Sequence, residues 1–212
     1  MKVAIIGAGK VGGSIATGLS RKGHQIVLGT RDPGDADVKT LATKLGATVA
    51  LPREAAAGAD VVVLSLPWGA AEAAVKSLGD LSGKTVIDCM NPVGMVNGAL
   101  GLTLGHSTSA GETVQAWLPG ACVIKTLNQV GAELMADNSR LTARPVMFMA
   151  GNDDAAKKTV AGLLADLGFE PQDAGDITKA RILEPFAMTW INQALVRGLG
   201  RDWAFGIVRP KG

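Results

Sequence analysis

The sequence is short of histidine and cysteine, two residue types on which many catalytic and metal sites depend. Its 212 residues include two histidines, His24 and His106, and two cysteines, Cys89 and Cys122. Two cysteines are too few for a disulfide framework, and these two do not have the spacing of metal ligands. We therefore expect two packed thiols and no metal site.

Long apolar runs and an excess of one charge are also missing. Although 47% of the residues are hydrophobic, no run approaches the roughly 20 residues that cross a membrane. The first expected strand starts at Lys2, which leaves no room for a signal peptide before the fold. The net charge is +2, and the basic residues form no stripe. We expect a cytoplasmic protein with neither a membrane nor a nucleic acid as its partner.

A regular alternation of strand and helix patterns fills most of the chain. Patterns that are typical of strands occur at residues 3–6, 25–28, 47–50, 61–66, 85–88, 121–126 and 146–150, and residues 169–173 read as a last strand. Residues 89–108 are rich in glycine and read as a long loop. The alternation predicts a Rossmann-type, doubly wound α/β fold with a mostly parallel sheet and helices on both faces. We expect one domain, residues 1–212, in which a nucleotide-binding core (1–120) is followed by an α/β extension of the same sheet (121–212).

A glycine-rich turn links the first strand to the first helix. Residues 7–12 read Gly-Ala-Gly-Lys-Val-Gly and match the dinucleotide-binding fingerprint. In this fingerprint Gly7 allows the tight turn, Gly9 lets the backbone approach a pyrophosphate, and Gly12 lets the helix pack closely on the strand. The helix N-terminus, with Lys10 and Val11, then faces the anion. The sequence therefore predicts a dinucleotide site at this turn.

The tip of the second strand indicates which dinucleotide binds. An NAD site usually has a carboxylate there, but in this chain Thr30 and Arg31 come first. A hydroxyl and a guanidinium suit the 2′-phosphate of NADP, and the guanidinium can also stack on adenine. Asp32 precedes a Pro-Gly pair, so we expect it to start a turn or cap the next helix. We therefore expect NADP(H).

Other residues follow later strands at the carboxyl edge of the sheet, where ligands bind in open α/β folds. The expected cofactor contacts are Leu66, Pro67, Trp68, Asn91 and Pro92. Trp68 can stack on a ring system or simply close the end of the sheet. His106, in the glycine-rich loop, is a weak catalytic candidate. Alternatively, His106 is a residue of a mobile loop and has no catalytic role.

Several motifs together resemble one family. They are the glycine turn, Gly29-Thr30-Arg31, Leu66-Pro67-Trp68, Asp173-Ala174-Gly175, and the stretch from Lys179 to Glu184 that contains Arg-Ile-Leu-Glu. The whole chain resembles the F420-dependent NADP reductases, which move a hydride between NADPH and a deazaflavin coenzyme. The resemblance implies coenzyme F420 or FMN as a co-substrate, and it implies that Thr126 and Asn128 border this small-molecule acceptor. Such a transfer needs orientation rather than a nucleophile.

Two other functions fit the same residues. Lys125 can serve as the general acid of a ketone or imine reductase, although enzymes of that kind usually have a long helical second domain. A redox sensor that binds NADP(H) without turnover would carry the same glycine turn and the same Arg31.

The C-terminal part, residues 178–198, is expected to be helical. Leu183, Trp190 and Leu195 belong to one apolar face, and Pro185 should kink or restart the helix. This face either packs on the sheet or contacts a second subunit. From it we expect a homodimer.

Overall fold

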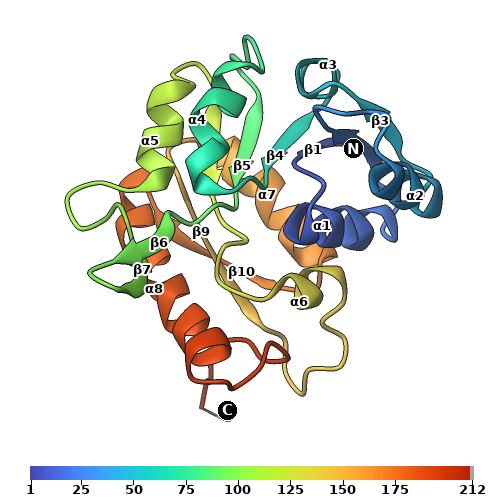
Figure 1. Ribbon diagram of the computed structural model, residues 1–212. Coiled ribbons are helices and arrows are strands. Elements are labelled where there is room, and N and C mark those ends of the chain that lie inside the picture. Colours follow the sequence, from blue (N-terminus) through green and yellow to red (C-terminus); the bar gives the residue numbers. More distant parts are fainter. Residues whose placement is uncertain (211–212) are drawn as a thin grey trace.

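In the computed structural model, which describes residues 1–210, the strand patterns form one mostly parallel sheet with helices on both faces (Figure 1). The eight strands lie in the order β10-β9-β8-β5-β4-β1-β2-β3. They are β1 (Lys2–Ile6), β2 (Gln25–Gly29), β3 (Thr48–Ala50), β4 (Val61–Leu64), β5 (Thr85–Asp88), β8 (Cys122–Lys125), β9 (Val146–Gly151) and β10 (Glu170–Gly175). Only the pairing of β8 with β9 is antiparallel within this sheet. The predicted fold class is confirmed.

The strand order places a topological switch between β1 and β4. The chain winds from β1 toward β2 and β3 on one side, and from β4 toward β5 and β8 on the other. Crevices at the carboxyl ends of strands on either side of such a reversal are where open α/β folds bind ligands. The glycine turn after β1 and residues 65–67 after β4 both lie there.

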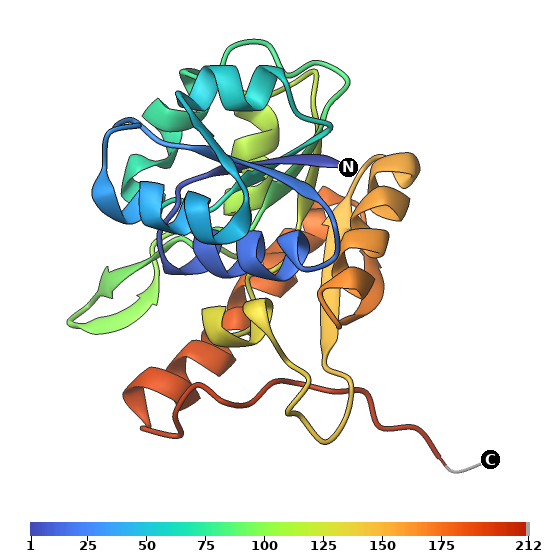
Figure 2. The same cartoon turned by 90° about the vertical axis from the view of Figure 1, so that its right-hand side faces the viewer.

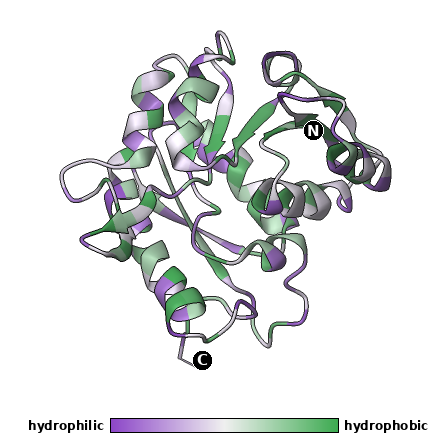
Figure 3. Ribbon diagram, viewed as in Figure 1, coloured by the Kyte–Doolittle hydropathy of each residue, from purple (hydrophilic) through white to green (hydrophobic). Residues whose placement is uncertain are grey.

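The central strands of the sheet have apolar side chains on both faces, as expected for a parallel sheet that is covered on both sides. Val3 and Ile5 of β1 belong to one buried cluster, and Ala4 and Ile6 belong to the other. The first face is covered by α1 (Lys10–Ser20), α2 (Ala36–Leu45), α6 (Ala132–Ala136) and α7 (Asp154–Asp166). The second is covered by α3 (Pro52–Ala57), α4 (Trp68–Lys76) and α5 (Ala110–Trp117). In Figure 3 the strands of the core are accordingly coloured as hydrophobic.

The prediction of a long loop at residues 89–108 is wrong in part. This segment contains a β-hairpin, β6 (Val93–Val96) and β7 (Ala99–Leu102), which projects from the main sheet (Figure 2). Asn97 and Gly98 form its turn, with φ values of 50° and 80°. An Asn-Gly pair suits a two-residue hairpin turn because both central positions need positive φ.

The C-terminal helix α8 (Ala180–Ile191) follows a short 3-10 turn, η1 (Ile177–Lys179), and ends in a π-helical turn, η2 (Asn192–Val196). It does not restart at Pro185, which lies inside α8. Leu183 and Trp190 are buried against the rest of the chain, whereas Leu195 is exposed. The apolar face therefore packs on the fold over most of its length.

The segment after η2 turns back under the molecule (Figure 2). Trp190 Nε1 donates to the Trp203 carbonyl at 2.9 Å, and the Val146 amide donates to the Phe205 carbonyl at 2.9 Å. Phe186 contacts both Phe148 of β9 and Phe205. These contacts fix α8 to β9. Within residues 1–210 no helix is both long enough and apolar enough to cross a membrane.

Candidate functional site

The glycine turn has the close approaches that a dinucleotide fingerprint requires. Gly7 has a φ of 99°, and a Cβ on Gly12 would lie 2.0 Å from the Gly7 carbonyl oxygen. A Cβ on Gly9, by contrast, would meet no atom within 4 Å. Gly7 and Gly12 are therefore needed by the fold itself, whereas Gly9 leaves its backbone open to a ligand.

The start of α1 offers free backbone donors beside Gly9. Gly9 is the N-cap, and it supplies no side chain to cap the helix. Lys10 and Val11 form the first turn, where backbone N–H groups have no intrahelical acceptor. The positive end of the helix dipole adds to the attraction for an anion. The turn thus fits a pyrophosphate group.

Ser65 supports the turn from the end of β4, and the sequence analysis missed it. Its hydroxyl lies 2.7 Å from the Gly7 carbonyl and 3.1 Å from the Ile6 carbonyl, so it can donate to either. A serine directly after a buried strand was the available signal.

A hollow of about 550 Å³ extends from the glycine turn to the tip of β2. We call it the first hollow. It is lined by Ile6, Gly7, Ala8, Gly29, Thr30, Arg31, Pro52, Leu66, Pro67, Ala70, Ala73, Ala74 and Ser77. Five predicted cofactor contacts are therefore brought together: Gly7, Thr30, Arg31, Leu66 and Pro67. The small side chains of α4 were missed, although their spacing places them on one helix face.

Residues 30–35 form a tight turn that presents Arg31. The Thr30 hydroxyl accepts from the Asp32 amide at 3.3 Å, and the Asp32 carboxylate accepts from the Gly34 amide at 2.8 Å. Asp35 rather than Asp32 caps α2. Arg31 is exposed and no carboxylate stands in its place at the tip of β2. A guanidinium in this position suits a phosphate.

Trp68 lies against α5 and does not line the first hollow. Its ring stacks on Trp117, with centroids 5.5 Å apart and an angle of 19° between the planes. Both rings pack on the second core cluster. The Trp68 ring therefore packs between α4 and α5.

Asn91 and Asn128 form a reciprocal pair at the carboxyl ends of β5 and β8. Asn91 Nδ2 donates to the Asn128 carbonyl at 2.8 Å, and Asn128 Nδ2 donates to Asn91 Oδ1 at 3.0 Å. Pro92 follows directly, and its carbonyl accepts from the Thr103 amide and hydroxyl at 2.7 and 3.0 Å. The pair thus joins the β8 end to the base of the hairpin.

Thr126 and Lys125 are fully buried, so neither presents its side chain to a ligand in this arrangement. The Thr126 hydroxyl donates to the Phe148 carbonyl at 2.8 Å. The Lys125 ammonium lies 3.1 Å from Asp88 Oδ2 and 3.0 Å from Glu184 Oε1, and it also donates to the Met90 carbonyl. An ammonium has three N–H donors, and all three are taken.

The charge state of Lys125 follows from its neighbours. Burial alone would lower the pKa of the Lys125 ammonium, but the carboxylates of Asp88 and Glu184 outweigh burial and raise the pKa above its ordinary value. The side chain therefore stays protonated, and it is a poor proton donor.

A second hollow, of about 330 Å³, lies between the hairpin and α8. It is lined by Gly101, Leu102, Leu104, Gly105, His106, Pro185 and Met188. His106 is exposed and has a φ of 60°, in the left-handed region. The hairpin starts directly after Pro92, so this second hollow belongs to the carboxyl side of β5. His24, in contrast, bonds to Asp166 at 3.0 Å and lines neither hollow.

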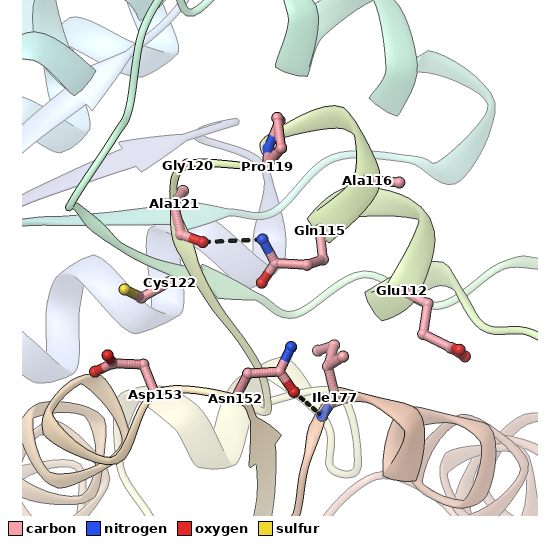
Figure 4. Close-up of a pocket in the computed structure, with 10 residues that line it drawn as sticks. All are labelled: Glu112, Gln115, Ala116, Pro119, Gly120, Ala121, Cys122, Asn152, Asp153 and Ile177. Carbon is pink, nitrogen blue, oxygen red and sulfur yellow. Dashed lines mark hydrogen bonds between the residues drawn. The ribbon is translucent and has the colours of Figure 1, made fainter.

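Another hollow, of about 610 Å³, lies at the amino end of β8 (Figure 4). Its polar side chains are already paired: Gln115 Nε2 donates to the Ala121 carbonyl at 2.9 Å, and Asn152 Oδ1 accepts from the Ile177 amide at 3.0 Å. It faces the sheet edge opposite the glycine turn, so it is not part of the dinucleotide site.

Cys89 is a packed thiol, whereas Cys122 is half-buried and lines the hollow at the amino end of β8. Burial raises the pKa of the Cys89 thiol above its usual range, and Asp88 adds to the shift. Cys89 Sγ donates to the Leu64 carbonyl at 2.9 Å, and both cysteines are free. Within residues 1–210, no three His, Cys, Asp or Glu side chains gather as they would around a metal ion.

Comparisons with known proteins agree with this geometry. Residues 2–92 match the family described as NADP oxidoreductase coenzyme F420-dependent. A solved structure from Arthrobacter sp. FB24, described as a candidate F420-dependent NADP reductase, is 35% identical with a TM-score of 0.90, and the match covers 99% of this chain and 100% of that one. The F420-dependent NADP reductase of Methanocaldococcus jannaschii is 29% identical over 198 residues, which are 87% of this chain and 88% of that protein.

A further similarity extends to a larger protein. Metalloreductase STEAP3 of Rattus norvegicus is 30% identical over 184 residues, which cover 86% of this chain. The matched part is only 36% of that protein, so the chain spans about a third of this relative.

Proposed function

The chain belongs to the family of F420-dependent NADP oxidoreductases and is an NADP-dependent oxidoreductase, and on this premise we propose that it transfers a hydride between NADP(H) and a deazaflavin or flavin-like acceptor. The observation that carries the proposal is the extent of the likeness. The Arthrobacter structure matches 99% of this chain, so the likeness includes the C-terminal segment as well as the glycine turn.

We assign NADP(H) to the first hollow. The open backbone at Gly9 and the N-terminus of α1 suit its pyrophosphate, and Thr30 with Arg31 suits its 2′-phosphate. The nicotinamide of the bound cofactor supplies or receives the hydride, and the protein contributes binding and orientation. The buried Lys125 takes no part as an acid in this assignment.

We assign the acceptor to the second hollow. Its walls are the hairpin and α8, and they combine apolar side chains such as Leu102 and Met188 with the polar His106. A volume of about 330 Å³ is within the range of small-molecule sites, roughly 300–1,000 Å³. A flat ring system with polar edges suits such a lining.

The proposal includes a homodimer that forms through the C-terminal segment. Ile182 is 63% exposed and Leu199 is 62% exposed, and both lie on or after α8. Subunit contacts commonly cover exposed large apolar side chains. Sedimentation equilibrium of the wild type and of Ile182→Asp tests this contact, because a monomeric wild type excludes the dimer.

The reaction is tested by initial rates of NADPH oxidation with coenzyme F420, with FMN, and with a panel of small ketones and imines. Each series is repeated with NADH. Fast reduction of the deazaflavin with NADPH, and slow reduction with NADH, supports both the acceptor class and the role of the β2 tip. FMN reduction alone retains a flavin-like acceptor but excludes the deazaflavin. Tight NADPH binding without turnover on any acceptor overturns the proposal in favour of a sensor.

A further inference from the structure

Lys125 joins three parts of the chain that are far apart in sequence. Its ammonium is held by Asp88 at the end of β5, by the Met90 carbonyl just beyond, and by Glu184 of α8. The three charged side chains are at most 1% exposed. Buried charges are costly unless they are paired, and removing one partner leaves the others uncompensated. The cluster therefore ties β5, β8 and α8 to fixed positions.

Glu184 also holds the start of α5. Its carboxylate accepts from the Ala110 amide and from the Gly111 amide, each at 3.0 Å. These are the first two donors of the helix, which have no intrahelical acceptor, and a carboxylate is favoured at that end. A Cβ on Gly111 would lie 2.9 Å from the Ala180 methyl, so glycine permits this close approach of α5 and α8.

The Asn91–Asn128 pair lies next to the cluster of Lys125, Asp88 and Glu184. Asn91 follows Met90, and Asn128 Nδ2 also lies 3.3 Å from the carbonyl of Leu183, the residue before Glu184. Between Lys125 and Asn128, the buried Leu127 has a φ of 56°, which is strained for a leucine. Such a strained backbone conformation persists only where the surrounding contacts hold it in place, and it is common at functional sites.

The two walls of the second hollow, the hairpin and α8, each begin next to a group that contacts the Lys125 ammonium. The hairpin wall starts from Met90 through Asn91 and Pro92, and the Pro92 carbonyl fixes Thr103, which follows β7 at the base of the hairpin. The α8 wall starts at Pro185, the residue that follows Glu184. The spacing of the two walls therefore depends on the contacts of one ammonium group.

Resting on the function proposed above, we propose that Lys125, with Asp88 and Glu184, is a positioning unit that sets the distance between the hairpin and α8 and so holds the acceptor in line with the nicotinamide. Lys125 touches no reacting atom in this role. The chemistry of hydride transfer tolerates little misplacement, since an error of about 1 Å can cost about 100-fold in rate.

The test variant is Glu184→Gln, with Glu112→Gln as its matched control. Both positions join α5 to α8: Glu112 Oε2 accepts from Arg181 Nε at 2.8 Å, away from the second hollow. Glutamine at 184 must turn an amide N–H toward a backbone donor or toward Lys125, so the variant loses at least one hydrogen bond and the negative charge of Glu184 while keeping the shape of the side chain. Both variants are expected to lose some stability, so stability alone does not distinguish them.

The expected result separates kcat from cofactor binding. Glu184→Gln lowers kcat with the acceptor by up to about 100-fold and raises the KM for the acceptor, while the Kd for NADPH stays unchanged. Glu112→Gln leaves kcat, KM and Kd unchanged. Asp88→Asn, which removes the other carboxylate, repeats the pattern of Glu184→Gln. Equal kinetic effects of Glu184→Gln and Glu112→Gln overturn the proposal.

A second readout does not depend on turnover. The side-chain amide NMR signals of Asn91 and Asn128 in the NADPH-bound protein shift in Glu184→Gln, and hydrogen exchange of the hairpin amides becomes faster. Glu112→Gln changes neither. If the wild type reduces no acceptor, the proposed function fails, but these spectra still decide whether the cluster positions the hairpin. Unchanged asparagine signals in Glu184→Gln refute the positioning unit even if deazaflavin turnover is fast.

Discussion

A methyl group on Gly12 would lie 2.0 Å from the carbonyl oxygen of Gly7 and 2.5 Å from Ser65 Oγ. The first of these neighbours is backbone and cannot move without opening the turn. We therefore predict that Gly12→Ala lowers the free energy of unfolding by about 1–3 kcal/mol, the usual cost of overpacking. Urea denaturation followed by circular dichroism measures this change.

The control for this prediction is Gly13→Ala, one position further along α1. Its nearest neighbour would be a methyl of Leu41 at 3.3 Å, the end of a flexible side chain. Alanine favours a helix over glycine by about 1 kcal/mol, so Gly13→Ala should be neutral or stabilising. A comparable loss in both variants would show that α1 tolerates no side chain here, whatever the contact to Gly7.

For Gly9 we predict the opposite of the effect at Gly12, namely weaker cofactor binding without a large loss of stability. Nothing lies within 4 Å of a Cβ built on it, so Gly9→Ala should fold with a stability change below about 1 kcal/mol, as for a weakened N-cap. The added methyl would occupy the space into which we place the pyrophosphate. Isothermal titration should then show NADPH binding weakened by about 1.5–3 kcal/mol, as when a charged hydrogen bond is lost. Wild-type affinity in a well-folded variant would argue against phosphate binding at this turn.

These glycine positions could be predicted from the sequence because their chemistry is local. Six consecutive residues contain all three glycines, and the strand before them and the helix after them are evident from periodicity. Thr30 and Arg31 were found for the same reason. Each depends on its position at a strand end, and strand ends can be placed from an apolar run alone.

The role of Lys125 could not be predicted in this way. Its partners Asp88 and Glu184 are far from it in the chain, and one sequence does not tell which charges meet in the core. The stacking of Trp68 on Trp117 is a long-range contact of the same kind. The hairpin is a different case, since Asn97-Gly98 is a local turn signal that the surrounding glycines obscured.

Glu112 provides a prediction on pH. The hydrogen bond from Arg181 lowers the pKa of the Glu112 carboxyl below its ordinary value of 4.5 in the folded protein. A carboxyl with a lowered folded-state pKa stabilises the fold fully above its unfolded pKa, and this contribution is lost as the pH falls through the folded-state pKa. The unfolding free energy of the wild type should therefore exceed that of Glu112→Gln above pH 4.5 and approach it at lower pH.

Urea denaturation at a series of pH values checks this, and Arg181→Met is the matched variant because it removes the other partner. Arg181→Met should remove most of the pH-dependent difference in unfolding free energy, and the hydrogen bond from Ser109 should retain the rest. If the difference in unfolding free energy between wild type and Glu112→Gln does not vary with pH, the ion pair with Arg181 is not the cause of that difference.

We predict that Arg31 decides which nicotinamide cofactor binds. It is exposed at the tip of β2, beside Thr30 and in the lining of the first hollow, and the 2′-phosphate that distinguishes NADPH from NADH suits its guanidinium. Arg31→Ala should weaken NADPH binding by about 1.5–3 kcal/mol and leave NADH binding nearly unchanged. Lys39→Ala, which removes a positive charge from the exposed surface of α2 outside the lining, is the control for general electrostatics. Titration of NADPH and of NADH against the wild type and the two variants measures these affinities. If Arg31→Ala loses equal affinity for both cofactors, the guanidinium contacts a part that both share, such as the adenine ring. Any preference for NADPH would then have another source.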